Sequence, residues 1–499
     1  MSAGRDARGL SLAALAERLG GVLHGDGAVR VGDLRHDSRA VEPGDLFVAL
    51  PGAAVDGLAF AAEAVARGAV ALLAERAPSG ATVPFVVVPD ARAALGPAAA
   101  AVHGHPSERV RVAAVTGTNG KTTTVELVCA ALARAGRRPA SMGTLGIRFA
   151  GAVRPYDLNT PEADATSRLL AELRDAGATE LVLEATSHGL AEHRLDGLAL
   201  AVGAFTNLTH DHLDLHGSFE AYGRAKARLF RELAPAVAVL DVDGPFGATL
   251  ARELGAAGGA RVLTVSVDGR AAIRAVSPCV DAAGVRARIE TPSGRVELCS
   301  RLFGRHNLSN LLVALGMALG LGVEPAVAAE ALSECAAPPG RLERCDAPGD
   351  DVVVLVDYAH SPDALDKALS AARLLGPGKL WCVFGCGGAR DRTKRAPMGE
   401  MAARRADVLV VTSDNPRSES AAAIAEAVLE GVARAGAHAT VELDRAAAIA
   451  LAVSSAAPGD VVVVAGKGHE TEQVVGAEHR PFDDRDEVRR GLAARRAGG

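Results

Sequence analysis

The feature that most constrains the fold is a glycine-rich loop between an apolar strand and a helix, in VRVAAVTGTNGKTTTVELVCAALARAG. Backbone amides and a helix N-terminus in such a loop point at an anion, so the pattern predicts a phosphate site. Gly117 and Gly120 let the backbone approach a phosphate closely. Lys121 supplies charge to the terminal phosphates, and Thr122 can hold Mg²⁺. We expect the helix to start near Thr122.

Continuous apolar runs before and after this loop predict parallel strands that are buried on both faces. The runs are VRVAAVTG, TELVLEAT, AVGAFTNLT, AVAVLDVD, DVVVLVDYAH, KLWCVFGCGG, ADVLVVTSDN and GDVVVVAGKGHE. Helical segments lie between them, so the fold class is α/β. Polar residues follow the strands directly, at the sheet edge where α/β proteins bind ligands.

The chain of 499 residues is too long for one core, and about two to four domains are expected. We predict three: residues 1–107, 108–338 and 339–499. The first is a small α/β unit, in which GDLRHDSRAVEPGDLFVALPG predicts strand, turn and strand. The linkers are expected in GHPSERV and in APPGRLERCDAPGD.

Composition excludes several classes of protein. A net charge of −6 argues against a nucleic-acid partner held by electrostatics. No uninterrupted apolar run of about 18 residues occurs, so no membrane span is predicted, and the first residues resemble a helix more than a signal peptide. The seven cysteines form no CxxC pair, which favours a reducing cytosol over disulfides or structural zinc. We expect a cytoplasmic monomer.

Acidic and histidine residues follow two of the predicted strands. Glu184 directly follows the apolar run of TELVLEAT, while His210, His212 and His216 lie with two aspartates in THDHLDLH. This segment almost matches the dizinc hydrolase pattern HxHxDH, but its last histidine is one residue late, and a hydrolase has no use for the phosphate loop. Glu184 and Thr122 can instead hold Mg²⁺ in an oxygen-rich site.

Taken together, the motifs resemble those of the Mur ligases, the ATP-dependent amide-forming enzymes of peptidoglycan precursor synthesis. Val115 replaces the glycine of the longer GxxxxGK[ST] pattern, leaving the shorter GTNGKT. The other motifs occur in the family's order and cover nearly the whole chain: EATSHGL, TNLTHDHLDLHGSFEAYGRAK, GRHNLSN, PGRLE and DYAHSPDAL. The resemblance implies a uridine-nucleotide domain, a central P-loop ATPase-like domain and a Rossmann-like domain for the incoming amino acid.

The resemblance also implies residue roles in the central domain. The ATP site would comprise Gly117, Thr118, Asn119, Gly120, Lys121, Thr122, Thr123, Asn307, Arg341 and Asp357. The lysine matching Lys226 is carbamoylated in the family, which converts a cation into a carboxylate-like metal ligand. Lys226 would then help Thr122, Glu184 and His212 to place Mg²⁺. Lys121, Lys226, Glu184 and His210 are the catalytic candidates, with His210, His188 and Asp357 as candidate general bases.

The nucleotide-linked substrate, UDP-N-acetylmuramoyl-L-Ala-D-Glu, would be bound by residues of the first two domains. The candidates are Ser38 in HDSR, Asn159 and Thr160 in LNTPEAD, Ser187 and Arg194. Three positions depart from the family's usual residues: Glu192 for glutamine, Thr186 for serine and Asn159 for threonine. Glu192 would repel an anionic substrate unless it is protonated or turned away.

The stretch VVTSDNPRSE carries the expected specificity. DNPR resembles the signature of the family's meso-diaminopimelate-adding ligases, whose amino acid carries a second ammonium and carboxylate. Arg417 offers a planar fork for the distal carboxylate, and Pro416 stiffens the loop. Gly466 and Glu470 would receive the distal ammonium, and Arg390 the other carboxylate. The predicted diaminopimelate site is Arg390, Asp414, Asn415, Pro416, Arg417, Gly466 and Glu470.

The predicted reaction phosphorylates the D-glutamate side-chain carboxylate with ATP and then joins it to the amine of diaminopimelate. Two alternatives remain. A ligase of the same architecture that adds lysine, or a folylpolyglutamate synthetase, would share the central domain. A P-loop ATPase that acts as a conformational switch would hydrolyse ATP without an amino acid.

Overall fold

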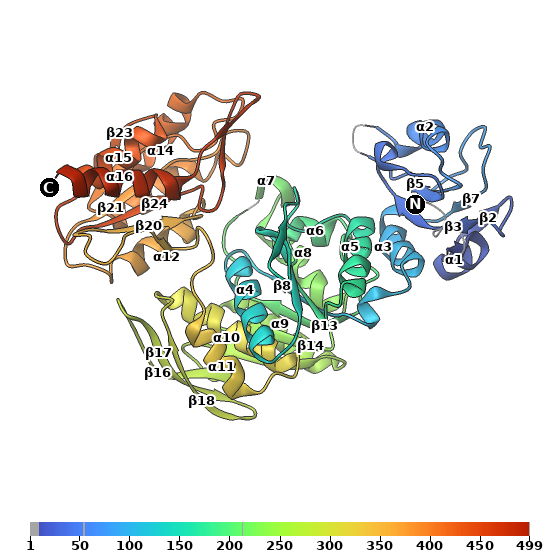
Figure 1. Ribbon diagram of the computed structural model, residues 1–499, viewed down its shortest axis with the longest axis horizontal. Helices are drawn as coiled ribbons and strands as arrows, with labels where there is room; N and C mark the ends of the chain where they lie inside the picture. Colours follow the sequence, from blue (N-terminus) through green and yellow to red (C-terminus); the bar gives the residue numbers. More distant parts are fainter. Residues whose placement is uncertain (1–8, 53–54, 212, 499) are drawn as a thin grey trace.

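The computed structural model describes residues 9–52, 55–211 and 213–498. It consists of three α/β units in chain order, each built on its own sheet. The N-terminal unit (blue) and the C-terminal unit (orange to red) lie on opposite sides of the central unit in Figure 1. Each sheet falls within one predicted domain range, while the boundaries at 107 and 338 stay predictions.

The N-terminal unit is a five-stranded sheet in the order β2-β7-β6-β5-β4, parallel except for the edge strand β2. Its strands are β2 (Val22–His24), β4 (Asp33–Arg35), β5 (Asp45–Val48), β6 (Ala71–Ala74) and β7 (Phe85–Val87), with a separate ladder of β1 (Leu10–Ser11) and β3 (Arg30–Val31). Its helices are α1 (Leu12–Leu19), α2 (Ala61–Ala66) and α3 (Ala91–Val102). The helix expected at the start of the chain is thus α1, capped by Ser11 and ended by Gly20 with φ +62°.

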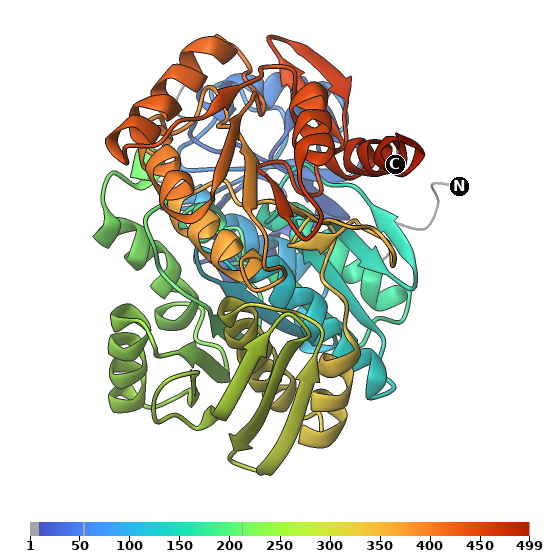
Figure 2. The same cartoon turned by 90° about the vertical axis from the view of Figure 1, so that its left-hand side faces the viewer.

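The central unit contains an eleven-stranded sheet in the order β11-β10-β9-β12-β8-β13-β14-β15-β16-β17-β18. The strands from β9 to β16 in this order pair in parallel. This confirms the prediction for β12, β8, β13 and β14, the four strands that the apolar runs contain. The strands are β8 (Arg111–Thr116), β9 (Pro139–Gly143), β10 (Gly146–Phe149), β11 (Ala152–Arg154), β12 (Glu180–Glu184), β13 (Leu200–Phe205), β14 (Val237–Asp241), β15 (Arg261–Ser266), β16 (Ile273–Asp281), β17 (Gly284–Thr291) and β18 (Gly294–Ser300). The antiparallel extension β16–β18 (olive, Figure 2) was not predicted.

Helices cover both faces of the central sheet. They are α4 (Lys121–Arg134), α5 (Ala163–Asp175), α6 (Ser187–Ala191), α7 (Leu213–His216), α8 (Phe219–Arg231), α9 (Pro245–Ala257), α10 (Arg305–Gly320) and α11 (Pro325–Glu334). Alternate residues of β8 face opposite cores: Val115 packs in the core that contains α4, α10 and α11, and Ala114 in the one that contains α5, α8 and α9. Burial on both faces is why β8 is apolar from Val112 to Val115.

The C-terminal unit has a six-stranded sheet in the order β19-β20-β24-β21-β22-β23, parallel apart from β19. Its strands are β19 (Glu343–Arg344), β20 (Val353–Asp357), β21 (Leu380–Phe384), β22 (Val408–Val411), β23 (Thr440–Val441) and β24 (Val461–Ala465), followed by the hairpin β25 (Glu472–Val475) and β26 (Glu478–Pro481). Its helices are α12 (Pro362–Ala372), α13 (Arg395–Arg405), α14 (Ala421–Arg434), α15 (Arg445–Ser455) and α16 (Asp484–Gly498).

The expected linker GHPSERV is a short 3₁₀ turn, Pro106–Glu108, in which Pro106 and Ser107 are buried. Among the described residues, no helix is long and apolar enough to cross a membrane. The seven cysteine thiols are free.

Candidate active site

The phosphate loop joins β8 to α4, as predicted, and its glycines are required by the backbone. Gly117 has φ +148°, and a Cβ there would lie 1.9 Å from Thr206 Oγ1. Gly120 has φ +90°, and its Cβ would lie 2.2 Å from Asn310 Oδ1. No side chain caps the α4 N-terminus, which begins at Lys121. The first amides of α4 therefore remain available to an anion.

Two lysines converge on one backbone oxygen of this loop. Lys121 Nζ and Lys226 Nζ each donate to the Gly117 carbonyl at 2.9 Å. Lys121 also donates to the Thr118 carbonyl at 2.9 Å. Burial lowers the pKa of Lys226 well below its usual range, and the nearby Lys121 ammonium adds to that shift. The loop amides and the Lys121 side chain therefore face the place where a polyphosphate anion would bind.

Lys226 is buried, although a lone lysine on a helix is usually solvated. It lies within α8 and is 1% exposed. Its ammonium packs 4.3 Å from the centroid of the Tyr222 ring. Packing of α8 against the loop buries it, which an amphipathic pattern does not reveal.

Oxygen atoms gather at the start of α4. Thr122 Oγ1 donates to Glu184 Oε1 at 2.9 Å and accepts from Arg341 Nη2 at 3.0 Å. Thr144 donates to Glu184 through its amide at 2.9 Å and its hydroxyl at 3.1 Å. Hydroxyl and carboxylate oxygens are the donors Mg²⁺ prefers, so Thr122 and Glu184 fit the expected cation. The predicted ligand His212 lies outside the described residues, which themselves hold no cluster of three His, Cys, Asp or Glu side chains.

A cavity of about 700 Å³ opens between the central and C-terminal units beside this loop. Of the predicted ATP residues, all but Gly117 line it: Thr118, Asn119, Gly120, Lys121, Thr122, Thr123, Asn307, Arg341 and Asp357. Burial raises the pKa of Asp357, which accepts from the Leu342 and Ala359 amides at 2.6 and 2.8 Å. Arg341 stacks 4.5 Å from the centroid of the Tyr358 ring.

Asp363 at the start of α12 joins the C-terminal unit to the phosphate loop. Its Oδ2 accepts from Asn119 Nδ2 at 2.9 Å and from Thr209 Oγ1 at 3.1 Å, both on the central unit. Lys367, one turn further along α12, donates to the same oxygen at 2.7 Å. This contact was not predicted, although Asp363 lies within the quoted motif DYAHSPDAL.

The predicted nucleotide-substrate residues fall into separate groups. Asn159 and Ser187 line the cavity, and Ser187 Oγ lies 3.0 Å from His216 Nε2. Thr160 is buried and donates to the Glu184 carbonyl at 2.8 Å. Ser38 lies apart from them in the N-terminal unit, where it donates to Glu63 at 3.3 Å.

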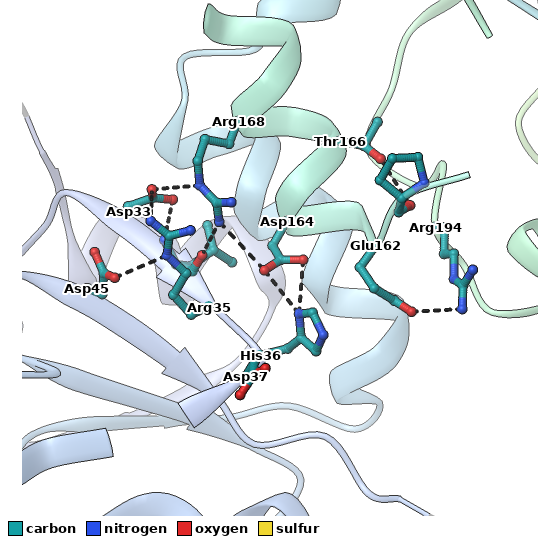
Figure 3. Close-up of polar contacts among 12 residues, drawn as sticks. Asp33, Arg35, His36, Asp37, Asp45, Glu162, Asp164, Thr166, Arg168 and Arg194 are labelled. Carbon is teal, nitrogen blue, oxygen red and sulfur yellow. Dashed lines mark hydrogen bonds and ion pairs between the residues drawn. The ribbon is translucent and has the colours of Figure 1, made fainter. Parts of the chain in front are cut away.

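Charged residues join the N-terminal unit to α5, as Figure 3 shows. His36 of HDSR lies 3.0 Å from Asp164, and Arg168 donates to Asp33 at 2.8 Å. Burial alone would lower the pKa of His36, but the hydrogen bond and charge of Asp164 outweigh burial and raise it. On the other side of α5, Glu162 pairs with Arg194 at 2.9 Å.

Glu192, the residue expected to repel an anionic substrate, has a cationic neighbour. Arg92 of α3 lies 3.6 Å from Glu192 and 2.8 Å from Glu162. A guanidinium from the N-terminal unit therefore offsets the carboxylate charge of Glu192, a contact that links residues far apart in the sequence.

Two candidate general bases lie at the margin of the site. His210 is exposed, and it does not line the cavity. His188 is half-buried, and burial lowers its pKa. Asp357 lines the cavity.

The loops after β21, β22 and β24 meet at one edge of the C-terminal sheet and bring the predicted amino-acid site together. A Cβ on Gly387 would lie 3.0 Å from Arg417 Nη1 and 4.0 Å from Arg390 Cγ, so these two arginines flank the same point. Arg417 has φ +52° and donates to the Gly388 carbonyl at 2.9 Å. Asp414, Pro416 and Gly466 are buried in the same cluster.

Asn415 and Glu470 already have partners within this cluster. Asn415 Nδ2 donates to Glu470 Oε2 at 2.8 Å. Lys467, which was not predicted, donates to both residues. The sequence feature that could have identified Lys467 is its position between Gly466 and Glu470 in AGKGHE.

Known proteins resemble this chain over nearly its full length. Three family descriptions match: "Mur ligase family, catalytic domain" at residues 31–103, "Mur ligase middle domain" at 115–318, and "Mur ligase, glutamate ligase domain" at 340–468. The UDP-N-acetylmuramoyl-L-alanyl-D-glutamate--2,6-diaminopimelate ligase of Gloeobacter violaceus is 43% identical, covering 91% of this chain and 92% of its own. The enzyme of that name from Prochlorococcus marinus is 45% identical, covering 90% and 92%.

Solved structures of Mur ligases also resemble this chain. One of a UDP-N-acetylmuramoyl-L-alanyl-D-glutamate--2,6-diaminopimelate ligase has a TM-score of 0.72 and 32% identity, covering 98% of this chain and 99% of that chain. The MurF ligase of Thermotoga maritima in complex with ADP, at 20% identity and a TM-score of 0.62 over 93% and 98% of the two chains, shares the fold. The chain therefore belongs to the Mur ligase family, the ATP-dependent ligases of peptidoglycan precursor synthesis.

Proposed function

We propose that this ligase adds meso-2,6-diaminopimelate to the D-glutamate side-chain carboxylate of UDP-N-acetylmuramoyl-L-Ala-D-Glu. The observation that carries the proposal is the convergence of Arg390, Arg417 and Glu470 at one sheet edge, which supplies both signs of charge for an amino acid with a second ammonium and carboxylate. The relatives named above carry the name of this activity. We further propose that the protein acts as a cytoplasmic monomer, with the domain ranges 1–107, 108–338 and 339–499.

The proposed reaction has two steps. The substrate carboxylate attacks the γ-phosphorus of ATP, breaking its bond to the bridging oxygen and giving an acyl phosphate and ADP. The neutral amine of diaminopimelate then attacks the acyl carbon, loses a proton, and the tetrahedral intermediate expels phosphate. Lys121 and the α4 amides offset the developing phosphate charge.

Mg²⁺, held by Thr122 and Glu184, would neutralise phosphate oxygens. Lys226 as an ammonium would repel this cation. As a neutral amine, which its lowered pKa favours, it can add to CO₂ and release a proton, giving the carbamate that the family resemblance implies. His212 would complete the ligand set.

We propose that the substrates are bound by different units. Ser38 of the first unit would hold the uridine nucleotide, and Asn159, Thr160, Ser187 and Arg194 the muramoyl-dipeptide. The cavity beside the phosphate loop would hold ATP. Closure of the units around it would exclude water from the acyl phosphate.

An omission experiment tests the proposal. Phosphate release and product mass are measured with ATP, Mg²⁺, the UDP-linked dipeptide and diaminopimelate, and then with each component left out. We expect release only in the complete mixture, with a product heavier by one amide-linked diaminopimelate. ATP hydrolysis that needs no amino acid would replace the proposal with the ATPase switch.

A further inference from the structure

Lys467 is a buried cation among the loops of the C-terminal sheet edge. It follows β24 by two residues, and its side chain is 0% exposed. Its Nζ donates to Asn415 Oδ1 at 3.0 Å and to Glu470 Oε2 at 3.0 Å. A fully buried ammonium is tolerated only where such partners offset its lost hydration.

These contacts fix which way the Asn415 amide faces. The Val474 amide also donates to Asn415 Oδ1, at 3.0 Å, so two donors converge on the same atom. That atom must be the oxygen, because an NH₂ group cannot accept. Asn415 Nδ2 is then directed at Glu470 Oε2, 2.8 Å away.

Glu470 is held in place by the same arrangement. Both hydrogen bonds, from Lys467 and Asn415, reach Oε2, and the Glu470 side chain is 29% exposed. Its carboxylate is thus anchored by one oxygen at the surface of the cluster, with lone pairs left for a cation from solvent.

We infer that Lys467 is a positioning residue for the distal ammonium of the amino-acid substrate: it orients Asn415 and anchors Glu470 so that the Glu470 carboxylate meets that ammonium. Asn415 then acts as a support for Glu470. The inference rests on the proposed function and adds a residue that does not itself touch the substrate.

The test compares two substrates that differ only at the distal ammonium. The variant Lys467→Met shortens the side chain by one heavy atom and removes its charge and its donors. Its kcat and KM are measured with diaminopimelate and with 2-aminopimelate, which has both carboxylates but no distal ammonium. The KM for diaminopimelate should rise about 10- to 100-fold, as expected for a lost charged hydrogen bond, and that for 2-aminopimelate less than about threefold. The KM for ATP should not change.

Lys379→Met is the matched control, because Lys379 is an exposed lysine of the same unit that precedes β21, at the opposite sheet edge. It should leave both substrates unaffected. If Lys467→Met does not fold, Lys467→Leu, which also removes the charge and the donors, carries the same comparison. Equal losses for both substrates, or no loss, would overturn the inference. A wild-type enzyme inactive with diaminopimelate would instead overturn the proposed function.

Discussion

At the scale of single residues, a fully buried ion pair supports the loops of the candidate amino-acid site. Arg445 and Asp484, each 0% exposed, form two hydrogen bonds at 2.6 and 2.7 Å. Arg445 also donates to the Ser413 carbonyl at 3.3 Å and the Ala465 carbonyl at 3.0 Å, the residues just before DNPR and Gly466. One guanidinium therefore joins two of the three loops that form the site, those after β22 and β24.

Removing only the cation of this pair should lower the free energy of unfolding. Arg445→Met leaves the Asp484 carboxylate buried and unpaired, and we expect the C-terminal unit to lose about 3–5 kcal/mol of unfolding free energy. The chain's one tryptophan, Trp381, lies in β21 of this unit, so urea unfolding followed by its fluorescence reports on the right part of the molecule.

The double variant Arg445→Met/Asp484→Leu is the control, since it removes the stranded charge and should recover most of the loss. If the single variant unfolds at the same urea concentration as the wild type, the pair does not stabilise the unit.

The role of a residue could be predicted from sequence only where one short motif contains both the residue and the groups that surround it in the fold. The phosphate loop does so, because glycines, lysine and helix start lie within a few positions. The burial of Lys226 and the partners of Asn415 depend on tertiary packing. The second lysine that donates to Gly117 comes from α8. Lys467 and Glu470 follow β24, whereas Asn415 follows β22.

At the scale of elements, α12 and the phosphate loop are coupled through Asp363. The N-terminus of α12 presents this carboxylate to Asn119 and Thr209 across the unit boundary. Asn119 lies between Thr118 and Gly120 of the phosphate loop. A displacement of α12 would therefore change the position of the loop that would bind ATP.

Asp363→Ala should loosen this coupling. Hydrogen bonds to a charged, partly exposed group contribute about 1–2 kcal/mol, so kcat should fall about 5- to 30-fold and the radius of gyration in small-angle scattering should rise. Asp366→Ala is the matched control on the same helix, because Asp366 pairs with Arg405 inside the C-terminal unit. Equal activity of the two variants would show that the contact has no part in turnover.

Strands could be predicted from sequence where their apolar residues form a continuous run. Buried parallel strands have apolar runs, and all eight quoted runs contain strands. The antiparallel strands β17 and β18 alternate instead: GVRARIET and GRVELCS are joined by a short turn at Pro292–Ser293. This period of two was present in the sequence, and a search limited to continuous runs passes over it.

At the scale of the whole molecule, the three units meet through polar contacts that the sequence does not reveal. His36 with Asp164, and Arg92 with Glu162 and Glu192, join the N-terminal unit to the central one. The contacts of Asp363 and of Arg341 with Thr122 join the central unit to the C-terminal one. The unit folds follow from periodicity, whereas these pairs bring together residues that lie far apart in the chain.

We propose that the C-terminal unit selects an amino acid with a second carboxylate and ammonium. The most direct measurement is kcat/KM for meso-diaminopimelate against L-lysine, with ATP and the UDP-linked dipeptide saturating. Lysine leaves Arg417 without its carboxylate partner, a penalty of about 2–4 kcal/mol, so we expect a preference of about 30- to 900-fold for diaminopimelate. Equal values, or a preference for lysine, would contradict it.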